Sequence, residues 1–158
     1  MTDKIRPFLW FDSNGEEAMD FYVSVFKNSK VLNVSRYPEG SPFPKGTMMG
    51  GTFLLEGREF LALNGGPHFK LNEAFSLFVD CESQEEVDTL WEKLTAGGGQ
   101  AGRCGWLKDR FGLSWQIIPA EMQKMMGDKD PRKAGRVVQA MMQMGKIDLK
   151  KLREAYAG

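Results

Sequence analysis

The sequence predicts an α+β protein made of two similar β-α-β-β-β modules followed by a helical tail. Its first support is an internal repeat: FLWFDSNGEEAMDFY near the N-terminus and the segment that ends in SLFVDCES both pass from an apolar run into an acidic helix start. With Asp12 placed over Asp80, Glu17 meets Glu85 and Asp20 meets Asp88. Its second support is that short apolar runs separated by turn residues follow each helix. One such half is too small to bury a core alone, so both halves are expected to form one compact domain.

The first module is predicted to cover residues 1–64. Its helix has one apolar stripe at helical spacing, formed by Ala18, Phe21, Tyr22, Val25 and Phe26. Ser13 with Glu16, or Asn14 with Glu17, is expected to supply a capping box at the helix start. Strands are expected at about 31–37, 47–56 and 58–63, with a proline- and glycine-rich loop over 38–46. Glu56-Gly57-Arg58 is typical of a tight hairpin.

A connector is predicted over residues 65–72 and the second module over 73–118. The second helix carries Val87, Leu90, Trp91 and Leu94 on one face. Ser83 and Glu86 predict its capping box, and the glycines at 97–99 predict its end. Strands are expected at about 100–102, 104–108 and 113–118. Asp109 is expected to stabilise the turn at 109–112 through hydrogen bonds to nearby backbone.

Residues 119–158 form the tail, whose sequence pattern predicts two or three helices. Asp130-Pro131 is suited to a helix start. Six of the ten methionines lie here: Met122, Met125, Met126, Met141, Met142 and Met144. Methionine fills irregular gaps in packed cores, and it also forms adaptable binding surfaces. The tail therefore favours either internal packing or a ligand or dimer surface, and we expect it to support a homodimer.

Composition excludes several classes of partner. The chain has 21 Lys and Arg against 21 Asp and Glu, so no strong field favours nucleic acid or a membrane surface. No apolar run approaches the roughly 20 residues that a membrane span requires. The N-terminal MTDKIRPFLWFDSNG lacks the features of a secretory signal. With only two cysteines there is no disulfide framework, so we expect a cytoplasmic protein.

FDSNGEEAMDFY and KDRFGLSWQIIP resemble the vicinal oxygen chelate superfamily, which includes glyoxalase I, extradiol dioxygenases and fosfomycin-resistance proteins. Four further segments resemble its PhnB-like branch, which is often labelled 3-demethylubiquinone-9 3-methyltransferase-like: NGGPHFKLNEAFSLFV, ESQEEVDTLWEKLTAGGG, CGWLKDRFGLSWQIIP and QAMMQMGKIDLKKLREAYAG. The resemblance implies a glyoxalase-like fold whose paired modules enclose a cleft.

In metal-dependent members, ligands come from the first and fourth strands of each module. By resemblance these positions fall near Arg6 or Pro7, near Ala62, at Ala74 or Phe75, and at Gln116. Divalent metals prefer several imidazole, carboxylate or thiolate ligands, and here only the Gln116 amide could bind at all. The sequence therefore predicts no metal and no other cofactor.

A small-molecule site is expected in this cleft, with these ligand-binding candidates: Trp10, Ala62, Asn64, His68, Cys104, Trp106 and Gln116. Because strand side chains alternate, Gln116 in the cleft places Trp115 under the helices. The same logic places Ala62 in the cleft and its neighbours Leu61 and Leu63 in the core.

His68 and Cys104 are the two candidates for catalysis. His68 suits proton transfer at neutral pH, or else fixes the connector by a hydrogen bond. Cys104 follows Arg103, whose charge would favour a thiolate, or else is a small buried apolar residue. The predicted function is metal-free binding of a small apolar or aromatic molecule. The alternative is an enzyme, either one acting on a small carbonyl or quinone-like substrate or a methyltransferase.

Overall fold

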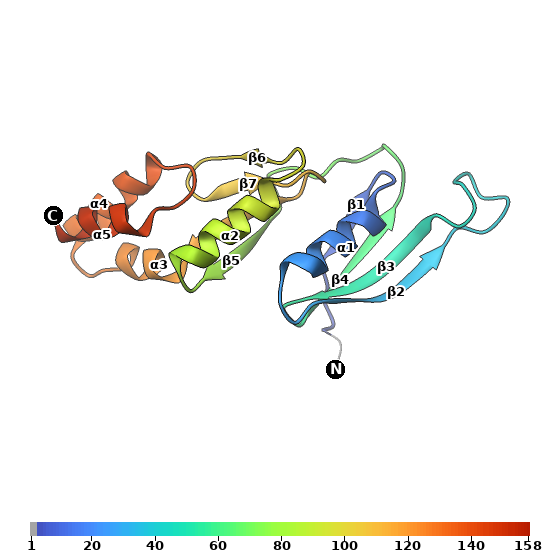
Figure 1. Cartoon of the computed structure of the whole chain (residues 1–158), viewed down its shortest axis with the longest axis horizontal. Coiled ribbons are helices and arrows are strands. Elements are labelled where there is room, and N and C mark those ends of the chain that lie inside the picture. The colour runs from blue at the N-terminus through green and yellow to red at the C-terminus, as the bar shows by residue number, and fades with distance from the viewer. Residues whose placement is uncertain (1–2) are drawn as a thin grey trace. The chain divides into compact units, whose positions relative to one another are not determined.

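The computed structural model describes residues 3–158, which form two compact units with the boundary between Leu71 and Asn72. Each unit contains one helix beside a four-stranded sheet, and the second unit also contains three C-terminal helices (Figure 1). The predicted α+β fold of two β-α-β-β-β modules with a helical tail is therefore confirmed.

The first unit has the strand order β1-β4-β3-β2. Its elements are β1 (Phe8–Phe11), α1 (Gly15–Val25), β2 (Lys30–Arg36), β3 (Met48–Leu55) and β4 (Arg58–Asn64). The β1 strand pairs parallel to β4, and the other pairs are antiparallel. Buried side chains from α1 and from one face of the sheet form the core: Leu9, Phe11, Ala18, Met19, Tyr22, Phe53 and Phe60.

The start of α1 differs from the prediction, because neither expected capping box forms. Asn14 is the N-cap residue, but its side chain makes no capping hydrogen bond. Instead the buried N–H of Gly15 donates to Oδ1 of Asn64 at 2.8 Å, from the end of β4. A Cβ on Gly15 would lie 2.7 Å from that same oxygen, so glycine permits this approach. The helix is thus capped by a residue that is distant in sequence, which a local motif cannot reveal.

The predicted tight hairpin joins β3 and β4, with Leu55 opposite Arg58. Its two loop residues, Glu56 and Gly57, have φ of 49° and 80°, as a type I′ turn requires. Asparagine tolerates this left-handed conformation better than glutamate does. We therefore expect Glu56→Asn to raise the free energy of unfolding by about 0.5–1 kcal/mol in urea denaturation. A decrease would contradict this account of the turn.

The second unit has the strand order β5-β8-β7-β6. Its elements are β5 (Ser76–Cys81), α2 (Gln84–Thr95), β6 (Gln100–Ala101), β7 (Trp106–Lys108) and β8 (Ser114–Pro119). The predicted Ser83 cap is confirmed, since its hydroxyl accepts from the N–H of Glu86 at 3.1 Å. The carboxylate of Glu86 accepts from the N–H of Glu82, so the reciprocal half of the box is shifted by one residue.

The β7 strand begins later than predicted, at Trp106 rather than at residue 104. Cys104 and Gly105 have φ of 58° and 84°, which is incompatible with an extended strand. Their N–H groups donate to Met144 and Gly145 at 2.9 and 2.8 Å, outside the sheet. These contacts with the segment after α4 turn the chain away from strand geometry.

The turn between β7 and β8 is built around Asp109, which is 3% exposed. As predicted, its carboxylate accepts from nearby backbone, the N–H groups of Phe111 and Leu113 at 2.8 and 3.1 Å. Its second oxygen accepts from the indole N–H of Trp115 at 2.8 Å. Asp109 therefore links the turn to the largest buried side chain of this unit.

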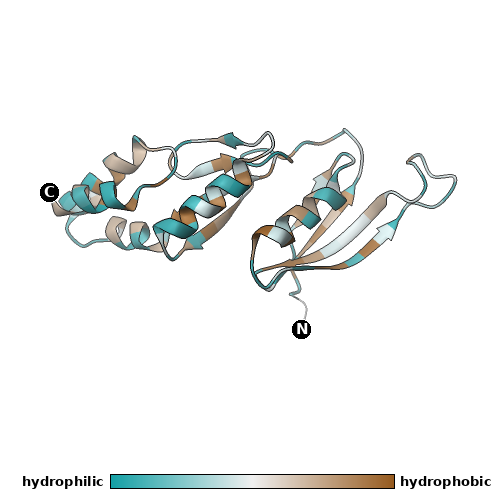
Figure 2. Ribbon diagram, viewed as in Figure 1, coloured by the Kyte–Doolittle hydropathy of each residue, from teal (hydrophilic) through white to brown (hydrophobic). Residues whose placement is uncertain are grey.

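The tail forms α3 (Ala120–Met126), α4 (Pro131–Met142) and α5 (Leu149–Ala157). These helices pack around their own apolar cluster, which includes Met125, Val137, Ile147, Leu149 and Leu152. The amide of Gln84 connects α2 to this cluster, donating to the carbonyl of Ile147 and accepting from the N–H of Leu149. Brown apolar and teal polar segments alternate along the helices, as amphipathic packing requires (Figure 2). Across residues 3–158, every helix is too short or too polar to cross a membrane.

Candidate functional site

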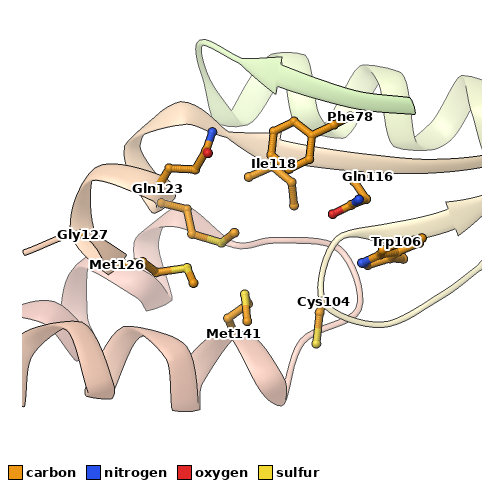
Figure 3. Close-up of a pocket in the computed structure, with 10 residues that line it drawn as sticks. Phe78, Cys104, Trp106, Gln116, Ile118, Gln123, Met126, Gly127 and Met141 are labelled. Carbon is orange, nitrogen blue, oxygen red and sulfur yellow. The ribbon is translucent and has the colours of Figure 1, made fainter. Parts of the chain in front are cut away.

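A hollow of about 450 Å³ lies within the second unit, between one face of its sheet and the helices α3 and α4 (Figure 3). Three strands contribute to it: β5 through Phe78, β7 through Trp106, and β8 through Gln116 and Ile118. The opposite face of this sheet packs against α2. The hollow therefore uses the sheet face that α2 leaves free.

Strand pairing directs the side chains at the centre of this face. Gln116 is the register partner of Phe78 on one side and of Trp106 on the other. Paired residues on neighbouring strands point to the same face of a sheet, so the carboxamide lies between two aromatic residues. Trp115, the next residue on β8, is 2% exposed and points away from the hollow. The opposite orientations predicted for Trp115 and Gln116 are confirmed.

Methionines form the wall opposite the strands. Met122 and Met126 come from α3 and Met141 from α4, and Figure 3 shows the labelled side chains pointing into the hollow. Met122 and Met126 are four residues apart, which places them on one helix face. Met122 also belongs to the apolar cluster of the tail, together with Met125, and Met126 and Met141 pack against that cluster. The predicted packing is confirmed, and Met122, Met126 and Met141 also line the hollow.

Two carboxamides, those of Gln116 and Gln123, line the hollow. Nε2 of Gln116 donates to the hydroxyl of Ser76 at 3.0 Å, and Nε2 of Gln123 donates to the carboxylate of Asp80 at 2.7 Å. Ser76 precedes Phe78 on β5 by two residues and so shares its face. These contacts orient both amides and use one N–H of each.

Cys104 contributes a half-buried thiol at the edge of the hollow. Its left-handed backbone is unusual for a residue other than glycine. Arg103, which the sequence offers as a cation beside this thiol, donates to the carbonyl of Met142 at 3.0 Å. The arginine therefore stabilises the end of α4.

The two cysteines are expected to differ in reactivity. Burial raises the pKa of the Cys81 thiol to about 12, so almost none of it is thiolate near neutral pH. Cys81 is 1% exposed, whereas Cys104 borders the hollow. We expect iodoacetamide at pH 7.5 to modify Cys104 and to leave Cys81 free, as measured by peptide mass spectrometry. Denaturant should expose both, and labelling of Cys81 in the folded protein would contradict this assignment.

The other four sequence candidates belong to the first unit. The indole N–H of Trp10 donates to the carbonyl of Gly66 at 2.9 Å, and its ring packs edge-on against Phe69. Asn64 is buried, with Oδ1 accepting from Gly15 and its carbonyl accepting from Tyr37. His68 is exposed in the connector. Only Cys104, Trp106 and Gln116 of the predicted set are brought together in the hollow of the second unit.

Ala62 has the opposite orientation to the one expected. It is 0% exposed and shares the α1 side of β4 with Phe60 and Asn64, while Leu61 and Leu63 are half-buried on the other side. Strand pairing explains the error. In the first unit Leu63 pairs with Trp10, and in the second unit Gln116 pairs with Phe78. Trp10 and Phe78 occupy equivalent positions in the internal repeat. The counterpart of Gln116 is therefore Leu63, one residue beyond the expected position.

Gln116 and its counterpart in the first unit, Leu63, do not suit a divalent ion. Gln116 offers a neutral amide between two aromatic residues, and its counterpart Leu63 has no donor atom. Within residues 3–158, no three side chains of His, Cys, Asp or Glu come together as a metal site. These two positions therefore lack the imidazole, carboxylate or thiolate ligands that divalent metals prefer.

Four lining residues are not predicted from the sequence: Phe78, Ile118, Gln123 and Gly127. Two of them had a local signal. Ile118 lies two residues after Gln116 on one strand, and Phe78 is the repeat equivalent of Trp10. Gln123 and Gly127 had none, because the position of α3 over the sheet depends on tertiary packing.

Comparison with known proteins gives a consistent assignment of fold. The family described as 3-demethylubiquinone-9 3-methyltransferase matches residues 3–118. A PhnB protein from Bacillus cereus, whose description carries the same methyltransferase name, is 38% identical, with 75% of this chain and 100% of that chain covered and a TM-score of 0.70. No curated protein matches the chain significantly.

Two more distant structures support the fold alone. Protein PA1353 from Pseudomonas aeruginosa is 22% identical, with 72% of this chain and 95% of that chain covered and a TM-score of 0.60. The fosfomycin resistance protein FosX from Listeria monocytogenes, solved with Mn(II) and sulfate, is 15% identical over 73% of this chain and 87% of its own, with a TM-score of 0.50. The family match ends at residue 118, so the helices α3 to α5 lie outside it.

Proposed function

Because the chain belongs to the 3-demethylubiquinone-9 3-methyltransferase family and is similar to a PhnB protein, we propose that it binds a small apolar or aromatic molecule in the hollow of its second unit. The observation that carries this proposal is the lining of that hollow. Aromatic, aliphatic and thioether side chains surround two oriented carboxamides, and the volume of about 450 Å³ lies within the range of small-molecule sites.

The composition of the walls indicates the kind of molecule. Phe78 and Trp106 present flat apolar surfaces, which favour stacking with a planar ring. Met122, Met126 and Met141 are flexible and polarizable, and they adjust to ligands of different outline. This combination supports an aromatic ligand more strongly than a charged one, because the hollow contains no Lys, Arg, Asp or Glu among its lining residues.

An enzymatic role is the second candidate, and Cys104 is the observation that favours it. Its thiol borders the hollow, and its left-handed backbone is of the strained kind that clusters at functional sites. His68, by contrast, is exposed in the first unit. An enzyme acting on a small carbonyl or quinone-like substrate would lose activity in Cys104→Ser. A methyltransferase would show saturable binding of S-adenosylmethionine in calorimetry.

Two neighbouring methionines provide a matched test of binding. Met141 lines the hollow, whereas Met142 is 53% exposed on the same helix. We expect Met141→Gln to weaken binding of 2-methylnaphthalene about tenfold, because it places a polar amide in an apolar wall. Met142→Gln should leave the Kd within twofold. Calorimetry or ligand-observed NMR measures both, with thermal melting as the folding control.

Two results would contradict the proposal. One is the absence of saturable binding of both 2-methylnaphthalene and its hydroxyl analogue 2-naphthol to the unmodified protein. The other is an equal loss of affinity in both folded variants, because binding would then not depend on the wall of the hollow.

A further inference from the structure

We infer that the hollow selects aromatic molecules that carry a hydrogen-bond donor, such as a phenolic hydroxyl, and that Gln116 determines this selectivity. The inference rests on the proposed function, since it names the class of molecule that the hollow would bind. It is argued from the positions of Phe78, Gln116 and Trp106 and from the hydrogen bond between Gln116 and Ser76.

The three side chains form a row across the sheet. Phe78, Gln116 and Trp106 occupy one register line on β5, β8 and β7, and Figure 3 shows the carboxamide between the two aromatic residues. Neighbouring strands are about 4.8 Å apart, so the two aromatic residues arise from strands about 10 Å apart. Aromatic rings in contact have centroids about 4.5–7 Å apart, so one planar ring fits above Gln116 with an aromatic neighbour on each side.

The carboxamide is oriented so that its oxygen is available to this ring. Nε2 donates to the hydroxyl of Ser76 at 3.0 Å, which directs the nitrogen toward β5. Figure 3 shows the oxygen directed into the hollow. Among the residues that the structure describes, no donor hydrogen-bonds to this oxygen. A carboxamide oxygen accepts hydrogen bonds only, so the group it favours on a ligand is a donor.

When a ligand buries the carboxamide oxygen of Gln116, the oxygen discriminates between ligands with and without a hydrogen-bond donor. A purely apolar ring that covers Gln116 displaces water from the oxygen without replacing its hydrogen bond, which is unfavourable. A ring with a hydroxyl group replaces that bond. Sites that hydrogen-bond a hydroxyl discriminate strongly against analogues that lack it. Because Gln116 is only half-buried, we expect an effect of about tenfold.

The test compares 2-naphthol with 2-methylnaphthalene, which has a methyl group in place of the hydroxyl. The measured quantity is the ratio of Kd for 2-methylnaphthalene to Kd for 2-naphthol, by calorimetry at pH 7. We expect this ratio to be about tenfold higher in the unmodified protein than in Gln116→Leu, which keeps the volume and removes the acceptor. The two probes differ in hydrophobicity, but this difference affects the Kd ratio equally in both proteins. Comparing the ratio in the unmodified protein with that in Gln116→Leu therefore removes it.

Two further variants complete the design. Gln116→Glu keeps an acceptor oxygen and should retain the preference for 2-naphthol. Gln123→Leu removes the other lining carboxamide, which is exposed and bonded to Asp80, and should leave the ratio within twofold. The probe 2-methoxynaphthalene has an oxygen but no donor, and it should bind like 2-methylnaphthalene.

The outcomes separate this inference from the proposed function. If both naphthalenes bind but the ratio is unchanged in Gln116→Leu, the inference is overturned and the hollow remains a binding site. Binding of 2-methoxynaphthalene as tight as that of 2-naphthol also overturns it, because a donor would not be needed. If neither compound binds the unmodified protein, both proposals fail. Should Gln116→Leu not fold, a folded Gln116→Glu that lacks the preference overturns the inference.

Discussion

Replacement of Asp109 by alanine is expected to lower the free energy of unfolding by about 3–5 kcal/mol. The carboxylate is 3% exposed and accepts from the N–H groups of Phe111 and Leu113 and from the indole of Trp115. Alanine removes this acceptor from two buried donors and one half-buried donor, each at a cost of about 1–3 kcal/mol when unsatisfied. Urea denaturation followed by circular dichroism measures the change.

Two variants calibrate this result. Asp109→Asn retains one acceptor oxygen but presents an NH2 group to one of the donors, so an intermediate loss is expected. Asp130→Ala removes an exposed helix cap, whose side chain accepts from the N–H of Arg132, and should cost about 1 kcal/mol. If Asp109→Ala were no more destabilising than Asp130→Ala, the role of Asp109 in organising this turn would be wrong.

Replacement of Gly105 by alanine is expected to cost about 3 kcal/mol of stability and to alter the hollow. Gly105 has φ of 84°, and an added Cβ would lie 2.5 Å from Cδ1 of Ile118 and 3.2 Å from the carbonyl of Ile117. The backbone cost is about 1–2 kcal/mol, and crowding in a packed interior adds a similar amount. Because Ile118 lines the hollow, its displacement should also weaken binding of aromatic probes.

Gly46 provides the matched control, because its φ of 85° is nearly the same but no atom lies within 4 Å of an added Cβ. We expect Gly46→Ala to show the backbone cost alone, about 1–2 kcal/mol. The difference between the two variants then measures the steric contribution at Gly105. Equal losses in the two variants would show that the space around Gly105 is not as tight as the structure indicates.

The internal repeat predicted most of the secondary structure. Strands, helices and the Glu56-Gly57 hairpin follow from period, turn chemistry and caps, which are properties of neighbouring residues. The errors occur where a distant residue decides the local conformation. Asn64 replaces the expected cap of α1, and contacts with Met144 and Gly145 shorten β7 at its start.

The site was predicted in part for the same reason. Gln116 and Trp115 were assigned to opposite faces correctly, because alternation along a strand is local. Ala62 was assigned to the wrong face, because an error of one residue in register reverses every side chain of a strand. Whether a methionine of the tail packs or lines the hollow was left open by the sequence.

The sequence by itself determined the order of elements, the duplicated architecture and the family of this protein, since all three are encoded in local pattern and motif. Only the tertiary structure decided which side chains meet. The hollow is lined by side chains of α3 and α4 as well as by the free face of the second sheet, so Met122, Met126 and Met141 meet Phe78 and Trp106 around one space. Such contacts depend on residues far apart in the chain, and no periodicity within one element records them.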